Sequence, residues 1–515
     1  MAVSKRDPNR ARPHPQYRKD AKYPGHQLIE ALPDIPTTEE AYEALLRRPP
    51  TRASGYRGLP THRKLDLHGE LRLLFLPTAE HVAVLQKIMR AIRDGLAYRD
   101  IKDPRVHAAL YRSAEGKGIG LSRLNPTGGG CLGLLLQGVT GSGKTSFLDR
   151  LVAYLTRDGT QSVIWHREIN GRRCSWPQIT CLRIQCQKSI KATVAELAAQ
   201  VDGLLGTNHR KRLNSRMATG LFLAALSQIL SIHFVGLLIV EDMQKLRTPE
   251  QAVLEFFCDL MEESGIPVLL VSTYKFRATL ARDPTLLSKL TAGGELDLGL
   301  MTYDPCWTTN PDPENDDWTP FVKELWELNT FSKSTPMPVW LPGVVHFHTQ
   351  GIRRITREFF VALFDRCAYV EPSKVTEALI DDIAETELAK YQAGLTALRR
   401  VRIQGEPISD AQAELVEHFL PPLEAVKLLQ VQIKARKAAT RAVQRTIPPK
   451  QPPSHKKTAG QHDQTPGSHS RATEPKAKHP HTKPKPRAPA AARDSAVYAR
   501  LKQSGKVIYP RGGTQ

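Results

Sequence analysis

The chain has 515 residues and a formal net charge of +21. This length exceeds what one ordinary hydrophobic core covers, so two or three domains are expected. A polar N-terminus and seven irregularly spaced cysteines argue against a secreted, disulfide-rich protein and predict a cytoplasmic protein with reduced thiols. The longest apolar stretch, 221–240, is interrupted by polar residues, which argues against a membrane span.

The positive charge is concentrated at the two ends of the chain. Residues 445–515 hold 15 Lys and Arg against 3 acidic residues, and residues 1–30 hold 7 against 3, so the region between them is only mildly basic. Basic tails are typical of proteins that contact a polyanion such as DNA or RNA. Solubilising disorder explains the tails equally well when they are taken alone.

In chain order, residues 1–30 are predicted to be a disordered basic arm, because they are rich in Arg, Lys, Pro and His. A helical N-terminal region follows over 31–127. A capping-box pattern at Thr37–Glu40 predicts its first helix, and an apolar stripe at helical spacing predicts another helix from about Thr78 to Arg93.

From residue 128 to 345 short apolar strands alternate with helices. Strands are predicted over 131–137, 162–166, 180–186, 236–241 and 266–272, and helices near 145–157, 190–205, 214–230 and 248–264. This alternation predicts an α/β domain with a parallel sheet covered on both faces. Its ligand is expected at the carboxyl ends of the strands.

After an irregular stretch with one short helix, 321–328, helical patterns dominate. Residues 346–445 are predicted to form a helical lid and further C-terminal helices. Residues 446–515 are predicted to be a disordered basic tail. The few apolar residues that return within 491–515 indicate either a docking peptide for a partner or an unstructured terminus.

The motif around which the chain is organised fits the phosphate-loop pattern G-x-x-x-x-G-K-[ST], preceded by an apolar strand and followed by a helix. Glycines allow backbone N–H groups to surround phosphate oxygens, Lys144 can reach the outer phosphates, and the Thr145 hydroxyl can bind Mg²⁺. The predicted cofactors are ATP and Mg²⁺. The predicted nucleotide-binding residues here are Gly138, Val139, Thr140, Gly141, Ser142, Gly143, Lys144, Thr145 and Ser146.

A second apolar strand, 236–241, ends in the acidic pair Glu241 and Asp242. The first acid is predicted to hold a water on Mg²⁺, and the second to orient or deprotonate the water that attacks the γ-phosphate. Such pairs usually read Asp-Glu, so this pair is inverted and each carboxylate is misplaced by one methylene. A misplacement of about 1 Å can cost roughly a hundredfold in rate, which predicts slow, regulatory ATP hydrolysis.

Two further sensors of the nucleotide are predicted, each with two candidate side chains. Thr273, or its neighbour Ser272, follows the strand 266–272 and can approach the γ-phosphate. In the predicted lid, Arg353 or Arg354 can supply a cation to the phosphates.

These motifs, taken together, resemble the TnsC/TniB group of AAA+ ATPases, which regulate bacterial cut-and-paste and CRISPR-associated transposons. The resemblance spans roughly residues 30–400. It is carried by the phosphate loop together with Leu76–Thr78, Ile92–Gly95, Gln178–Ile184, Val201–Thr207, Gly236–Leu246, Gly265–Pro267, Thr273–Lys275 and Thr349–Ile352.

The resemblance implies an AAA+ phosphate-loop fold and a bacterial, nucleoid-associated protein that forms a homo-oligomeric ring or filament on duplex DNA when ATP is bound. It also implies a target-selection partner of the TnsD/TniQ type, a transposase partner, and an arginine finger from a neighbouring subunit, for which Arg277 and Arg282 are the candidates. Cations at strand or helix ends are candidates for sequence-independent DNA contacts: Lys188, Lys191, Arg210, Lys211 and Arg212. A helicase or helicase loader, and a nucleotide-gated protein scaffold, are the alternatives.

Overall fold

A computed structural model describes residues 16–49, 55, 57–114, 121–124, 133–169, 171–187, 189–213, 219–246, 251–301, 303, 316–333, 335–370 and 375–399. The predicted basic tail 446–515, its docking peptide and the predicted helices beyond residue 400 lie outside these residues. Lys188 also lies outside them.

The centre of the fold is a five-stranded sheet with the strand order β4-β5-β6-β1-β7. Its strands are β1 (Gly133–Gln137), β4 (Leu182–Gln185), β5 (Leu238–Glu241), β6 (Val268–Ser272) and β7 (Gly294–Asp297). Every neighbouring pair is parallel. The side chains of β1, β5 and β6 are buried along their whole length, as apolar strands between two helical layers must be. The prediction of a parallel sheet is confirmed.

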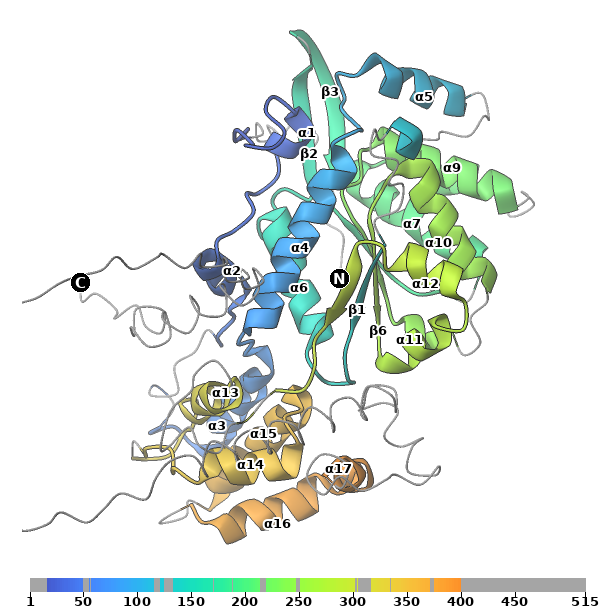
Figure 1. Ribbon diagram of the computed structural model, residues 1–515. Helices are drawn as coiled ribbons and strands as arrows, with labels where there is room; N and C mark the ends of the chain where they lie inside the picture. Colours follow the sequence, from blue (N-terminus) through green and yellow to red (C-terminus); the bar gives the residue numbers. More distant parts are fainter. Residues whose placement is uncertain are drawn as a thin grey trace, which may run out of the picture.

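Helices cover both faces of this sheet (Figure 1). On one face, α4 (Ala79–Leu96) and α6 (Lys144–Thr156) pack against Leu134, Leu136 and Ile239. On the other face, Leu135 and Val240 share a core with α7 (Ile190–Leu205), α9 (Thr219–Ile232), α10 (Gln251–Ser264) and α12 (Pro284–Leu290). Alternate residues of each strand therefore enter different cores.

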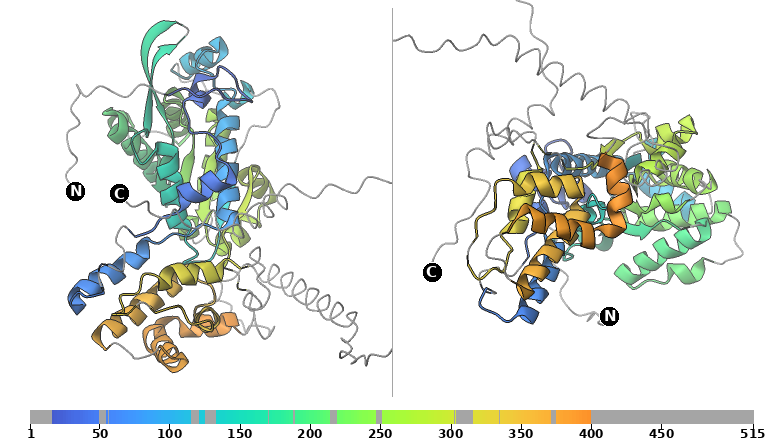
Figure 2. Two further views of the ribbon diagram at one scale, coloured as in Figure 1. Left: turned by 90° about the vertical axis from the view of Figure 1, so that its left-hand side faces the viewer. Right: turned by 90° about the horizontal axis from the view of Figure 1, so that it is seen from below.

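One predicted strand does not belong to this sheet, which corrects the sequence-based assignment. Residues 162–166 fall in β2 (Val163–Ile169), which pairs antiparallel with β3 (Arg172–Ile179) in a separate two-stranded sheet. This hairpin projects beyond the helices in Figure 1 and in the left view of Figure 2. The chain leaves the main sheet after β1, passes through α6 to the hairpin, and returns to the main sheet at β4.

The second half of the predicted disordered arm is ordered, so that prediction is wrong for residues 16–30. A short helix, α1 (Gln27–Glu30), buries Leu28 in the same core as α4. The Tyr17 hydroxyl bonds to His166 Nδ1 at 2.9 Å, and Gln178 on β3 bonds both to His166 Nε2 at 2.8 Å and to the Leu28 carbonyl at 3.0 Å. Hydrogen bonds that are buried or partly buried thus hold residues 16–30 against the hairpin.

The remaining N-terminal helices occupy two places. The Thr37 capping box is present and starts α2 (Thr38–Leu45), which packs beside α4 and α6. By contrast, α3 (Thr61–Glu70) and the 3-10 turn η2 (Leu71–Leu73) pack against the C-terminal helices. The helix α5 (Pro104–Ala114) contributes Val106 and Leu110 to the core shared with the sheet.

A helical bundle lies below the sheet in Figure 1; it contains the described helices of the predicted lid, 346–445, together with helices from outside that range. It consists of α3 with α13 (Trp318–Trp326), α14 (Leu341–Thr349), α15 (Arg353–Tyr369), α16 (Glu377–Glu387) and α17 (Gln392–Arg399). Its own core contains Trp318, Phe321, Phe359 and Phe360, all essentially inaccessible to solvent. The bundle therefore has a core of its own, separate from the two that flank the sheet.

Candidate functional site: a phosphate loop between sheet and lid

The phosphate loop connects the carboxyl end of β1 to the N-terminus of α6. Gly141 and Gly143 have φ angles of +86° and +104°, which side chains rarely allow, and Gly143 immediately precedes the first helical residue, Lys144. A Cβ atom at Gly138 would lie 2.3 Å from the Leu298 carbonyl oxygen. The three glycines of the motif are therefore required by the backbone itself, and the loop brings free N–H groups of a helix N-terminus to one point.

The side chain of Lys144 bonds to the backbone of its own loop. Its Nζ donates hydrogen bonds of 2.8 Å to the carbonyl oxygens of Gly138 and Val139. Burial lowers the pKa of Lys144 to about 8, while the nearby carboxylates of Asp242 and Asp297 oppose that shift. Phosphate oxygens are stronger acceptors than carbonyl groups, because they carry charge. The ammonium group is thus placed to exchange two carbonyl bonds for phosphate bonds.

Three buried hydroxyl groups around the loop have no hydrogen-bond partner among the residues that the structure describes. They are Ser142 Oγ in the loop, and Ser272 Oγ and Thr273 Oγ1 at the end of β6, the strand next to β1. A buried hydroxyl without a hydrogen bond costs about 1–3 kcal/mol. Such groups at the end of a sheet are explained by a polar ligand, and Thr273 lies where the sequence predicts a γ-phosphate sensor. Thr145, the predicted metal ligand, is exposed in the first turn of α6.

The acidic pair has its two side chains in different environments. Glu241 is the last residue of β5, is 5% exposed, and accepts a 2.5 Å hydrogen bond from Arg183 Nε on the neighbouring strand β4. Arg183 also donates to Asp149 on α6 at 2.6 Å. Asp242 has left-handed backbone geometry (φ +59°) and forms an ion pair with Lys245 at 2.9 Å. Asp242, and not Glu241, is the member of the pair that acts on the pKa of Lys144.

The two predicted lid arginines point to different surroundings. Arg353 is 2% exposed, donates to the Leu76 carbonyl at 2.6 Å, and lies over the rings of Phe75 and Phe321. Arg354 is exposed and pairs with Glu358, but its backbone N–H donates to the Gly141 carbonyl at 3.1 Å. The start of α15 therefore rests directly on the phosphate loop.

The other predicted side chains lie away from these contacts. Arg277 on α11 (Tyr274–Leu280) pairs with Glu295 at 3.2 Å, and Arg282 is exposed after that helix. Lys191, Arg210 and Lys211 are exposed on α7 and α8 (His209–Arg212), and the side chain of Arg212 lies outside the described residues. The structure describes one chain, so a role for these residues at a subunit or DNA interface remains a prediction.

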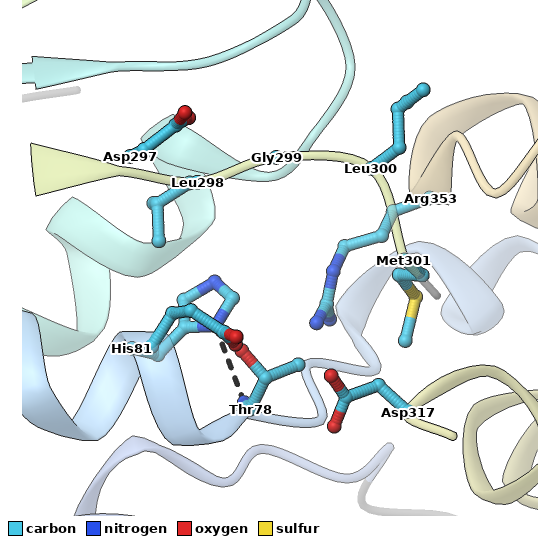
Figure 3. Close-up of a pocket in the computed structure, with 10 residues that line it drawn as sticks. Thr78, His81, Asp297, Leu298, Gly299, Leu300, Met301, Asp317 and Arg353 are labelled. Carbon is cyan, nitrogen blue, oxygen red and sulfur yellow. Dashed lines mark hydrogen bonds between the residues drawn. The ribbon is translucent and has the colours of Figure 1, made fainter. Parts of the chain in front are cut away.

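Three residues of the site were missed by sequence reasoning. Arg183 is the only cation in the apolar run 179–184, and an isolated charge in a buried strand signals a buried partner. Tyr274 donates to Asp297 Oδ1 at the end of β7, and burial raises the pKa of Asp297. His81, at the start of α4 (Figure 3), packs against the rings of Phe75 and Phe147 and has no sequence signal of its own.

Comparison with known proteins agrees with this geometry. The sequence profile of the AAA domain matches residues 128–280. No curated protein matches the sequence. Among the described residues, no helix is long and apolar enough to cross a membrane.

Similar solved structures include domain III of the replication initiation protein DnaA from Thermotoga maritima (14% identity, TM-score 0.30, covering 56% of this chain and 95% of that chain). The Aeropyrum pernix ORC1 protein, solved in complex with DNA, has 16% identity and a TM-score of 0.32 over 67% of this chain and 87% of that one. Drosophila ORC bound to DNA has 14% identity and a TM-score of 0.31 over 68% and 84%.

The profile match, the phosphate loop and the order of the parallel strands define a class: residues 128–280 contain an AAA domain, and the fold around it is an AAA+ phosphate-loop fold. A domain of this class indicates a nucleotide-hydrolysing ATPase.

Proposed function

We propose that this ATPase is an ATP-switched regulator of transposition of the TnsC/TniB type, which oligomerises on duplex DNA and links a target-selection protein to a transposase. ATP with Mg²⁺ is the proposed cofactor, and the bacterial cytoplasm is the proposed location. The observation that carries the switch is the direct contact between the phosphate loop and the lid, through the bond from the Arg354 N–H to the Gly141 carbonyl.

Through that contact, a nucleotide bound in the loop can change the position of the lid. A Cβ atom at Gly141 would lie 3.0 Å from Arg354 Cβ, and one at Gly143 would lie 3.3 Å from Arg353 Cδ. The first turn of α15 therefore lies close to the loop, and we expect phosphates that enter the loop to reorient it, and with it the lid. A lid that responds to the phosphates can change how one subunit meets the next, which is what assembly controlled by ATP requires.

The ion pairs that Glu241 and Asp242 form within the protein support slow hydrolysis. Glu241 must leave Arg183 before it can serve a metal ion, and Asp242 must leave Lys245 before it can act as a base. A long-lived ATP state suits a regulator better than a motor. The proposal of DNA as the partner is supported by the net charge of +21 and by the exposed cations of α7 and α8.

The test measures retention of long duplex DNA with ATP, with ADP and without nucleotide, in parallel with electron microscopy of the ATP complex. ATP-dependent binding that weakens steeply with salt is expected for phosphate contacts. Replacing Lys144 by Ala should abolish the dependence on ATP. If this variant still bound DNA in the presence of ATP as tightly as the unchanged protein does, the proposal would be overturned.

The DNA-contact residues have a matched control. Arg210→Ala with Lys211→Ala should weaken binding for all DNA sequences and lower the slope of log K against log salt by about two, one for each lost phosphate contact. Arg63→Ala with Lys323→Ala removes the same charge from exposed positions of the helical bundle and should leave the slope unchanged. Identical slopes for the two pairs would exclude α8 as a contact.

Two other outcomes would favour the alternatives. Strand displacement or loading of a helicase coupled to ATP turnover would indicate a replication ATPase. Absence of DNA binding in every nucleotide state, with a partner protein retained by residues 491–515, would indicate a nucleotide-gated scaffold.

A further inference from the structure

The hairpin of β2 and β3 lies at the end of the sheet opposite the phosphate loop. Ile179, the last residue of β3, donates its N–H to the His233 carbonyl at 2.9 Å and accepts from the Gly236 N–H at 3.0 Å, and both partners lie shortly before β5. The hairpin therefore joins the sheet at the amino ends of the parallel strands, whereas the phosphate loop follows the carboxyl end of β1. Figure 1 shows the hairpin and the helical bundle at opposite ends of the sheet.

One face of the hairpin packs onto the rest of the protein. His166 and Gln178 are buried on this face and bond to the arm. The Trp176 Nε1–H donates to the Ile232 carbonyl at 2.6 Å, and the Trp176 ring lies 5.9 Å from that of Phe234 between centroids. These contacts, with the arm and with the end of α9, fix the hairpin at a place remote from the phosphate loop and the lid.

The outer part of the hairpin carries three exposed arginines. They are Arg167 near the end of β2, and Arg172 and Arg173 at the start of β3. Side chains alternate between two faces along a strand, so Arg167 lies on the face opposite that of the buried His166. Glu168 is the register partner of Arg173 and is the one acidic residue between Arg167 and Arg173, so the tip keeps a net charge of +2.

A narrow ribbon that projects from the fold and carries guanidinium groups matches duplex DNA. A two-stranded β-ribbon has the width that the major groove, about 12 Å across, admits. Guanidinium groups form paired hydrogen bonds with phosphate oxygens. Lys19, two residues after the Tyr17 that bonds to His166, adds an exposed cation beside the hairpin. An acidic peptide needs no such projection, because it can lie along a flat basic surface.

We propose that the tip of the β2–β3 hairpin binds the phosphate backbone of duplex DNA, and that this contact forms with or without bound nucleotide. The inference rests on the proposed DNA partner and adds a second contact to it. The hairpin and the phosphate loop are separated by the length of the strands, roughly 13–17 Å for the 4 to 5 residues that they contain. The nucleotide then controls assembly, while the hairpin gives each subunit a basal affinity for DNA of any sequence.

The test measures the affinity of the full chain for a short labelled duplex, without nucleotide, over a range of salt concentrations. The hairpin variant combines Arg167→Ala, Arg172→Ala and Arg173→Ala. A second variant replaces the same three arginines by Lys, which keeps the charge and removes the paired hydrogen bonds. The control variant removes three exposed cations of the helical bundle or of the loop beside it: Arg63→Ala, Lys323→Ala and Lys333→Ala. The basic tails are identical in all four proteins, so differences among them report on the substituted positions.

The hairpin variant should bind DNA more weakly than the unchanged protein, and the slope of log K against log salt should fall by about two to three, since each lost phosphate contact removes about 0.9. The Lys variant should keep most of the slope, and the control variant should match the unchanged protein. Equal slopes for the hairpin and control variants would overturn the inference, as would absence of DNA binding by the unchanged protein without nucleotide. Loss of binding to polyglutamate, with binding to DNA retained, would also overturn it and would indicate an acidic protein partner.

Adding ATP separates this contact from the proposed switch. The hairpin variant should gain as much DNA affinity from ATP as the unchanged protein does, because its phosphate loop is intact, and a variant that lost this gain would contradict the independence of the two contacts. If ATP gave the unchanged protein no added affinity, the proposed switch would fail, while the slopes measured without nucleotide would still decide the role of the hairpin. Thermal unfolding checks that the substituted side chains, which are exposed, leave the fold intact.

Discussion

The phosphate loop and the acidic end of β5 lie at the same edge of the sheet, yet they are prepared for ligands in different ways. The loop holds its cation on two neutral carbonyl groups and has an unpartnered hydroxyl beside it. At the end of β5, Glu241 is held by a guanidinium that also binds Asp149. Exchanging a carbonyl for a phosphate favours binding, whereas separating a buried carboxylate from its cation opposes it.

With the predicted roles of Glu241 and Asp242, this difference would separate nucleotide binding from hydrolysis. ATP would enter the loop while the acidic pair keeps its ion pairs, whereas water attack would require both carboxylates to change partners. We therefore expect mutations in the two regions to have different signatures: loss of affinity in the loop, and loss of turnover or of stability at the strand end.

The largest effect is expected for Asp242→Asn. Asp242 is the predicted base, and removing a general base commonly lowers the rate by about 10²- to 10⁴-fold. ATP affinity should change little, because Asp242 lies outside the loop, so the ATP-bound state should last longer. Single-turnover hydrolysis and equilibrium ATP binding measure the two quantities. Unchanged turnover would mean that another group activates the water.

Lys144→Ala should show the opposite signature. Charge-assisted hydrogen bonds contribute about 1.5–3 kcal/mol each, so losing the contacts of Lys144 to phosphate should weaken ATP binding by roughly 100-fold. Titration calorimetry with ATP and Mg²⁺ measures this. The free protein should remain folded, since Lys144 bonds only to carbonyl groups of its own loop. Normal ATP binding by this variant would mean that the phosphate loop is not part of the nucleotide site.

Arg183→Gln tests whether the strand end is held closed. Glu241 would lose its partner while it is 7% exposed at the side chain, and we expect the free protein to lose about 1–3 kcal/mol, less than for a fully buried pair because Arg183 is partly exposed. Magnesium with ATP should restore more stability to this variant than it adds to the unchanged protein, since a metal ion can replace the guanidinium. Thermal unfolding with and without Mg²⁺ and ATP measures both values.

A smaller effect is expected for Asp149→Asn, the matched control for Arg183. Asp149 is 53% exposed at the side chain, and exposed ion pairs contribute only about 0–1 kcal/mol. Glu241 would keep its guanidinium, so the added stability from Mg²⁺ and ATP should equal that of the unchanged protein. A loss as large as that of Arg183→Gln would place the important partner of Arg183 on α6 and not on β5.

Sequence reasoning located the features that are encoded locally. The glycine pattern specifies the phosphate loop, and the apolar runs of β1, β5 and β6 specify buried parallel strands. Contacts that depend on strand register could not be predicted from the sequence. Arg183 contacts Glu241 because β4 pairs with β5 in the register that places Gln185 opposite Glu241. The four residues of β7 include two acids and no apolar run, so the edge strand had no periodicity to detect.

The position of α3 affects how the lid can move. It precedes the whole AAA domain in the chain but packs on α15, so the lid bundle is joined to the sheet by the chain before β1 as well as by the chain after β7. Arg353 and Arg357 bind the carbonyls of Leu76 and Leu74 within the first of these connections. The chain before α3 also comes from the sheet region, because α2 packs beside α4 and α6, so α3 is connected to that region on both sides. Any swing of the lid must also pull on the start of α4, where His81 lies.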